Sequence, residues 1–411
     1  MDRAGVGVSA SAGEILFLAH RMPFPPDRGD KIHSHHVLRA LAALAPVHVA
    51  CFADDADDWA QEGALAAVAA SHCLRPRAKS MAVAGVQALM RGLPISLTAF
   101  HDPAIATYVR EKVASGRIGT IFVFSGQMGQ YVPDDFPGRV ILDLVDVDSA
   151  KFDAYAMQGN PLMRWVHARE GRLLAVREAA YARRADVTLF VSRNEADVFA
   201  RRAGHDARIG VLSNGIDCGH FSPETAPDPV MAALPAPRLI FTGQMDYAPN
   251  IAAVTRAARE LMPAVRARLP QASFHILGRA PTEQVRALDG VNGTRVHGGV
   301  PDMRPYLSAA TMALVPLAIA RGVQNKVLEA MAMALPCVLT PGAATGIDAR
   351  DGQDYLIADS DDALVDAVLA LTHDPLRAHA MGQAARAHVL AHASWEAALA
   401  PLTTLIVPHA G

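Results

Sequence analysis

Residues 314–339 read LVPLAIARGVQNKVLEAMAMALPCVL, and they are the most informative segment for the fold class. The apolar run 313–317 predicts a buried strand, and a turn containing Gly322 leads into an amphipathic helix that begins at Asn325. A second apolar run at 337–340 predicts the next strand. Strand, turn, helix and strand together predict one βαβ unit of a parallel sheet.

Two charged side chains stand near the start of this predicted helix. Lys326 lies in the first turn, and Glu329 follows three residues later on the same face. The N–H groups of a helix start favour an anion, a lysine adds a charge suited to phosphate, and a carboxylate can accept hydrogen bonds from a ribose diol. The residues predict a sugar-nucleotide site. An ordinary amphipathic helix with a solvated Lys–Glu pair is the alternative interpretation.

The composition of the 411 residues indicates a folded protein of two to three domains. Hydrophobic residues make up 51% and charged residues 19%, which argues against wholesale disorder. The formal net charge of −3 argues against a general nucleic-acid-binding protein. The four cysteines lie far apart, so the sequence predicts neither a disulfide framework nor a zinc site, as expected in a reducing cytosol.

Strand and helix patterns alternate in two series and predict an α/β protein with two doubly wound domains. We expect a disordered tail without a secretory signal at 1–13, an N-terminal domain at 14–220 and a C-terminal domain at 238–392. Five prolines predict an interdomain linker at 221–237. A terminal helix within 393–411 is expected to pack back toward the N-terminal domain.

The N-terminal domain carries polar residues at its predicted strand ends. The loop after the first strand contains Gly29 and Lys31, which either approach a ligand or simply turn the chain. This loop lacks G-x-G-x-x-G, which disfavours a dinucleotide-dependent oxidoreductase. Gln127 follows the strand 120–124, and residues 146–148 form a D-x-D sequence. For the D-x-D we favour a polar strand end over a metal site, so no metal is expected.

Residues 161–184 predict one long basic helix with six arginines and two glutamates. The simpler interpretation is a surface helix with one packed stripe. The alternative is an amphipathic face that rests on an anionic membrane. Arg75, Arg77, Lys79 and Arg91 can extend the same basic surface.

Several segments, in their order and spacing, resemble the family 4 retaining glycosyltransferases of the GT-B fold. They are FTGQMDYAPNI, FHILGR, VHGGVPDMRPYLSAA, VPLAIARGVQNKVLEAMAMALPCVLT and SWE, and the resemblance extends from about Glu14 to Leu402. The segments HRMPFPPDRGDKIHSHHVLRALA and LDLVDVDSAKFDAYA resemble a narrower group, the sugar transferases of PEP-CTERM/exosortase exopolysaccharide systems.

The resemblance implies two Rossmann-like domains facing a cleft, and metal-independent transfer of a sugar from a nucleoside diphosphate donor with retention. It also implies a lipid-linked saccharide acceptor and a cytoplasmic protein attached peripherally to the inner face of the membrane. Glu329 matches the second glutamate of the family's E-x7-E motif, which contacts the ribose. Arg321 replaces the first glutamate, and we expect this position to choose the donor sugar.

The predicted site combines the helix start with further strand ends. Lys326, Arg321 and Asn325 are expected to stabilise charge on the leaving diphosphate. The other predicted donor contacts are Glu329, Gly322, Gly243, Gln244, Gly299, Thr345, Gly346, Gly29, Lys31 and Gln127. No cofactor beyond the donor and no protein general base is assigned. A non-catalytic nucleotide-sugar-binding scaffold and a sugar-nucleotide epimerase of the same fold are the alternative functions.

Overall fold

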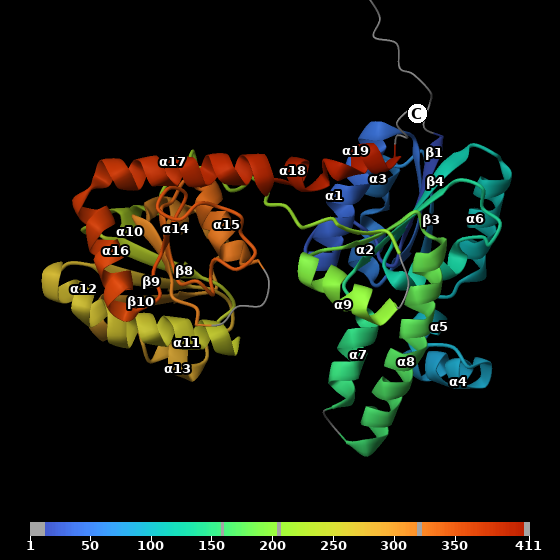
Figure 1. Ribbon diagram of the computed structural model, residues 1–411, viewed down its shortest axis with the longest axis horizontal. Helices are drawn as coiled ribbons and strands as arrows, with labels where there is room; N and C mark the ends of the chain where they lie inside the picture. The colour runs from blue at the N-terminus through green and yellow to red at the C-terminus, as the bar shows by residue number, and fades with distance from the viewer. Residues whose placement is uncertain (1–12, 158–159, 204–206, 319–322, 407–411) are drawn as a thin grey trace, which may run out of the picture. The chain divides into compact units, whose positions relative to one another are not determined.

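The computed structural model describes residues 13–157, 160–203, 207–318 and 323–406 (Figure 1). Contacts divide the chain into two units, 1–214 with 399–411 and 215–398. The predicted tail, apart from residue 13, lies outside the described residues.

The N-terminal unit is built on a seven-stranded parallel sheet with the strand order β3-β2-β1-β4-β5-β6-β7. The strands are β1 (Glu14–Ala19), β2 (Val47–Ala53), β3 (Ser71–Pro76), β4 (Ile118–Phe124), β5 (Arg139–Val145), β6 (Val187–Phe190) and β7 (Ile209–Val211). β1 and β2 are almost fully buried, which explains their unbroken apolar runs. The strand order reverses between β1 and β4.

Ten α-helices are described in this unit. They are α1 (Gly29–Leu44), α2 (Ala56–Ala60), α3 (Glu62–Ala66), α4 (Met81–Arg91), α5 (Ile95–Ala99), α6 (Pro103–Ala114), α7 (Asp148–Ala156), α8 (Pro161–Arg184), α9 (Arg193–Ala203) and α19 (Pro401–Ile406). α19 packs on α1, so the C-terminal end of the chain belongs to this unit.

The C-terminal unit has a six-stranded parallel sheet with the order β10-β9-β8-β11-β12-β13. Its strands are β8 (Arg238–Thr242), β9 (Ser273–Leu277), β10 (Thr294–Gly298), β11 (Met312–Val315), β12 (Cys337–Leu339) and β13 (Leu356–Ile357). The strand order reverses between β8 and β11. In doubly wound sheets, ligands bind at the carboxyl ends of the strands beside such a reversal.

The described helices of this unit are α10 (Pro229–Ala232), α11 (Ala248–Arg256), α12 (Met262–Arg268), α13 (Glu283–Arg286), α14 (Arg304–Ala309), α15 (Asn325–Ala332), α16 (Asp361–His373), α17 (Pro375–His392) and α18 (Trp395–Leu399). A π-helical segment, Ala257–Leu261, joins α11 to α12. It precedes Pro263, whose missing N–H disturbs the regular bonding of an α-helix.

The division between the units differs from the expected linker. Within 221–237, the N–H of Asp228 donates to the carbonyl of Pro305 at 2.8 Å, and the hydroxyl of Ser308 donates to the carbonyl of Thr225 at 2.7 Å. Because these bonds tie the proline-rich segment to the C-terminal unit, the division falls earlier, at Asn214. None of the described helices has the length and apolar character needed to cross a bilayer.

α17 holds α15 in place through a helix–helix contact at Gly382. An ideal Cβ on Gly382 would lie 2.0 Å from the carbonyl oxygen of Ala334, just beyond α15. Only a residue without a side chain therefore allows this approach. Gly85 in α4 is a matched helical glycine with open space around its Cβ position.

Replacing these two glycines with alanine is expected to have opposite effects. Gly382→Ala forces the helices apart and should lower the free energy of unfolding by about 1–3 kcal/mol. Gly85→Ala should raise it by about 0.5–1 kcal/mol, since alanine favours a helix interior. Urea denaturation of both variants measures the difference, and a stabilised Gly382→Ala variant would contradict the packing described.

Candidate functional site

The candidate site in the C-terminal unit lies where the sheet reverses. Gly243 follows β8, and its ideal Cβ would lie 2.8 Å from Nδ2 of Asn250 and 3.3 Å from Nζ of Lys326. Gly243 has φ +155°, outside the range favoured by other residues. Glycine therefore allows the end of β8, α11 and α15 to meet at one point.

Lys326 is a half-buried cation without a carboxylate partner among the described residues. Its Nζ donates to Oδ1 of Asn250 at 2.6 Å and lies 4.6 Å from the centre of the Phe241 ring. Burial lowers the pKa of Lys326 to about 8, even though the charge of Glu329 acts in the opposite direction. An amide oxygen and a ring face only partly replace the lost hydration, so this ammonium is prepared to bind an anion.

Glu329 is the carboxylate nearest in sequence on the same helix. Burial raises its pKa to about 7, opposed by the positive charge of Lys326. No side-chain hydrogen bond of Glu329 is found in the described ranges. Its carboxylate thus remains available to accept hydrogen bonds from a ligand.

The start of α15 adds backbone donors to the same place. Gln324 precedes the helix and provides no side-chain cap, and Asn325 is exposed in the first turn. The first N–H groups of an uncapped helix can bind an anion. Gly346, with φ +79°, brings the loop after β12 close to this start, because its ideal Cβ would lie 3.0 Å from Val323. Thr345 is exposed beside it.

The other four predicted residues of this unit are Gln244, Gly299, Arg321 and Gly322. The carbonyl of Gln244 accepts a hydrogen bond from Asn250 at 2.9 Å, while its side chain is exposed. Gly299 follows β10 and lies beside Arg279, which follows β9. Arg321 and Gly322 lie outside the described residues.

In the N-terminal unit, Lys31 has a structural partner. Lys31 and Asp58 are each only 1% exposed and form a buried ion pair. Asp58 also accepts a hydrogen bond from the N–H of Asp54 at 2.8 Å. This favours a structural role for Lys31 over the predicted ligand contact. Gly29 begins α1 with open space at its Cβ position, so its backbone remains accessible.

Gln127 lies in a polar network at the ends of β4 and β5. It accepts a hydrogen bond from Ser125 and donates to Asp148 at 3.0 Å. The Lys151 ammonium bridges the two carboxylates of the D-x-D sequence, at 2.8 Å from Asp146 and 3.3 Å from Asp148. The D-x-D carboxylates are therefore held by a lysine within this network.

Strained backbone marks the same two strand ends. Ser125 has φ +77° and Val145 has φ +67°, a conformation that is unfavourable for a β-branched residue. Beside them, the buried ring of His33 contacts Asp143 at 3.2 Å and Asn214 at 2.6 Å. Backbone strain of this kind clusters at functional sites, so this edge is a second candidate surface.

Sequence reasoning missed two contributors to the site at α15. Phe241 reads as one more buried strand residue, and Asn250 reads as part of an ordinary helix start. A signal was present for Asn250, because a polar residue in the helix turn that follows a parallel strand lies at the sheet's carboxyl edge.

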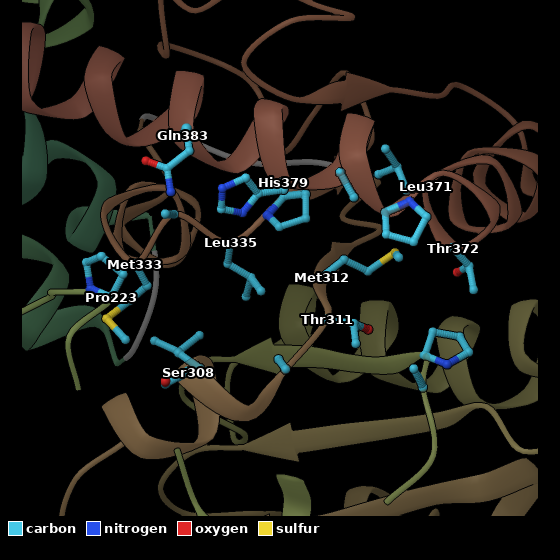
Figure 2. Close-up of a pocket in the computed structure, with 18 residues that line it drawn as sticks. Pro223, Ser308, Thr311, Met312, Met333, Leu335, Leu371, Thr372, His379 and Gln383 are labelled. Atoms are coloured by element: carbon cyan, nitrogen blue, oxygen red, sulfur yellow. The ribbon is translucent and has the colours of Figure 1, made fainter. Parts of the chain in front are cut away.

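A separate groove of the C-terminal unit lies elsewhere. It has a volume of about 420 Å³ and includes Pro237, Met312 and Pro336, which lie at the amino ends of their strands. Figure 2 shows Met312 and Leu335 beside His379 of α17. The groove therefore lies at the opposite edge of the sheet from Lys326.

The buried pair in the N-terminal unit gives a stability prediction. Asp58→Asn removes the buried carboxylate partner of Lys31, leaves only the half-exposed Asp27 at 3.7 Å, and should cost about 3–5 kcal/mol of unfolding free energy. Asp134→Asn removes a carboxylate that is 95% exposed and pairs with Arg184, so it should cost less than about 1 kcal/mol. Chemical denaturation measures both. Equal, small losses would contradict the structural role of Lys31.

The lowered pKa of Lys326 gives a pH prediction. In the free protein the Lys326 ammonium loses its proton as the pH rises through about 8. A bound anion would stabilise the ammonium and keep Lys326 protonated to higher pH. Phosphates are already ionised in this range. The affinity for a nucleoside diphosphate should therefore fall by up to about tenfold per pH unit above pH 8. Calorimetric titration across this range tests it, with Lys326→Arg as the variant whose affinity should stay level. A level wild-type profile would contradict the assignment.

Comparison with known protein families identifies part of the C-terminal unit. Residues 236–374 match the family model described as "Glycosyl transferases group 1". The match includes β8 and α15, and with them Gly243, Lys326 and Glu329.

Two curated relatives are 27% identical over 241 residues, which is 54% of this chain and 62% of each relative. One is the GDP-mannose-dependent monoacylated alpha-(1-6)-phosphatidylinositol monomannoside mannosyltransferase of Corynebacterium glutamicum. The other is the corresponding GDP-mannose-dependent mannosyltransferase of Mycolicibacterium smegmatis. The aligned region thus spans less than two thirds of their length.

Solved structures resemble the chain over nearly its whole length. HepE of Anabaena in complex with UDP has a TM-score of 0.60 and 14% identity, covering 95% of this chain and 98% of that one. TarM, with a TM-score of 0.61 and 10% identity, covers 96% and 98%. Sucrose-phosphate synthase of Thermosynechococcus elongatus has a TM-score of 0.56 and 17% identity, covering 96% and 98%. The chain therefore has the GT-B fold, and residues 236–374 of its C-terminal unit are similar to the group 1 glycosyltransferases.

Proposed function

We propose that the protein is a retaining glycosyltransferase that moves a sugar from a nucleoside diphosphate donor to a saccharide acceptor. One observation carries the proposal: the half-buried Lys326 ammonium has no carboxylate partner in the described structure and lies at the start of α15, where the sheet reverses. A ligand diphosphate would supply the missing negative charge. The match of this segment to the group 1 glycosyltransferases supports the same conclusion.

The reaction breaks the bond between the anomeric carbon and the β-phosphate oxygen, which takes the electron pair. The acceptor hydroxyl oxygen bonds to the same carbon face, and its proton passes to the leaving phosphate. Lys326 and the N–H groups near Asn325 stabilise the charge that grows on the diphosphate. A preorganised donor of this kind contributes about 3–4 kcal/mol to catalysis.

The other residues are given separate tasks in this proposal. Glu329 accepts hydrogen bonds from the ribose diol, and the backbones of Gly243 and Gly346 allow close approach of the donor. Arg321 stands in the sequence where related enzymes have a glutamate, and we assign it to the choice of donor sugar. Gly29 and Gln127 are proposed donor or acceptor contacts from the N-terminal unit.

The acceptor is proposed to be a lipid-linked saccharide, used in exopolysaccharide assembly at the inner face of the membrane. The curated relatives are named for transfer to phosphatidylinositol mannosides, which supports a lipid acceptor. The N-terminal segments that resemble transferases of PEP-CTERM/exosortase systems support the exopolysaccharide assignment. GDP and UDP are the nucleotides to test first, since the relatives use GDP-mannose and HepE was crystallised with UDP.

Replacing Lys326 tests the proposal. Lys326→Ala should lower sugar transfer by about a hundredfold or more, because the diphosphate loses its charged donor. Glu329→Ala should mainly weaken the affinity for the nucleotide. Thermal shifts with GDP, UDP and their sugars identify the donor, and transfer to a lipid-linked saccharide extract measures turnover. Lys112→Ala is the control, because Lys112 packs over Tyr108 in α6 of the other unit and is not among the proposed contacts.

Three outcomes would contradict the proposal. Near-normal transfer by a folded Lys326→Ala variant would remove Lys326 from the mechanism. Donor binding without any turnover would favour a nucleotide-sugar-binding scaffold. Conversion of the donor sugar without an acceptor would favour an epimerase.

A further inference from the structure

Exposed apolar side chains are concentrated on one part of the N-terminal unit. Of the seventeen large hydrophobic residues that are exposed in the described chain, five belong to α4, two to the end of α7 and four to α8. They are Met81, Val83, Val86, Leu89, Met90, Tyr155, Met157, Leu162, Met163, Trp165 and Val176. Scattered exposed apolar residues are normal, but such a cluster marks an interaction surface. We call these residues the apolar surface.

α4 differs from an ordinary surface helix because its large apolar side chains are exposed and its buried side chains are small. Its buried positions are the small residues Ala84 and Ala88, whereas Met90 is 82% exposed and Val86 is 59% exposed. Val83, Val86 and Met90 have spacings of three and four residues, so they form one outward stripe. The large side chains of α4 therefore face away from the core of their own unit.

α4 is fixed firmly to α8. The guanidinium of Arg169 donates to the carbonyls of Ala88 and Leu93, each at 3.1 Å. The carboxylate of Glu170 accepts hydrogen bonds from the N–H groups of Ile95 and Ser96 at 2.7 and 2.8 Å. These bonds make α4, α5 and α8 one platform, and Figure 1 shows α4, α7 and α8 projecting from the sheet together.

Most charges around the apolar surface are positive, and the exposed Asp153 of α7 is paired with Arg202. Both glutamates of α8 are buried and hydrogen-bonded. Glu170 accepts a hydrogen bond from the hydroxyl of Ser96 at the start of α5, and Glu178 accepts one from the hydroxyl of Ser149. With Glu170 and Glu178 only 2% and 4% exposed, the exposed charges of α8 are arginines. Beside α4, a cavity of about 480 Å³ is lined by Arg77, Lys79, Arg91 and His101, with Asp102 at one side.

We propose that the apolar surface docks on a lipid bilayer that contains anionic phospholipids. The side chains of α4 and of the α8 start would enter the interface, and the surrounding arginines and lysine would contact phosphate groups. A projecting apolar surface bordered by positive charge fits an anionic bilayer, whereas the core of a protein–protein interface is depleted of charge. The inference goes beyond the proposed reaction, because lipid binding requires neither donor nor turnover.

Vesicle sedimentation with the full chain tests the proposal. Wild-type protein should bind vesicles of phosphatidylcholine with phosphatidylglycerol, and should bind phosphatidylcholine vesicles weakly. Met90→Glu should lower binding about fivefold to tenfold, and Arg91→Glu should lower it about fivefold. Raised salt should release the wild-type protein. Leu376→Glu is the matched control, because Leu376 is 84% exposed on α17 in the other unit, and its binding should equal that of wild type.

The outcomes separate lipid docking from its alternatives. Equal binding to both kinds of vesicle, or equal losses in Met90→Glu and Leu376→Glu, would overturn the proposal. A different outcome would also overturn it: wild-type protein does not bind vesicles but self-associates, and Met90→Glu abolishes the self-association. A second copy of the chain would then cover the apolar surface. Circular dichroism and nucleotide affinity should be unchanged in Met90→Glu, so that lost lipid binding does not reflect misfolding or a failed donor site.

Discussion

The Lys326 ammonium is held between the Asn250 amide oxygen and the Phe241 ring, and the candidate site depends on these two contacts. The parallel sheet pairs β8 with β11, and Gly243 allows the close approach of Asn250 and Lys326 to the end of β8. α17 packs against the end of α15 through the close contact between Gly382 and Ala334. The arrangement removes water from a positive charge, and the nearby Glu329 carboxylate makes no ion pair with it in the described structure. That cost in the free protein is the source of affinity for an anionic ligand.

Much of the fold could be predicted because its signals are local. The helix 161–184 and the helix start at Asn325 coincide with α8 and α15, since flanking residues and periodicity define both. β3 was missed because Leu74 is its only buried residue, so Ser71–Pro76 lacks the apolar run of a central strand. The proline-rich segment 221–237 looked like a linker, but its attachment depends on hydrogen bonds to Pro305 and Ser308, about eighty residues away.

In the candidate site, too, some residues could be predicted from local sequence patterns and others could not. Lys326 and Glu329 could be found from a helix start and a three-residue spacing. Asn250, which orients Lys326, lies 76 residues away in sequence, and no local pattern joins the two. Lys31 looked available beside Gly29, because its partner Asp58 comes from another element 27 residues later. Ion pairs and buried hydrogen bonds between distant residues therefore decide which charges remain for a ligand, and only the folded chain shows them.

The most direct test of the central claim is a measurement of the Lys326 side-chain pKa by NMR on protein with ¹⁵N-labelled lysine, with and without a nucleoside diphosphate. We expect a value near 8 in the free protein, because burial disfavours the charged form. A bound diphosphate should raise it by one unit or more, which corresponds to at least about 1.4 kcal/mol of interaction. A pKa that does not change when the nucleotide binds would contradict the account.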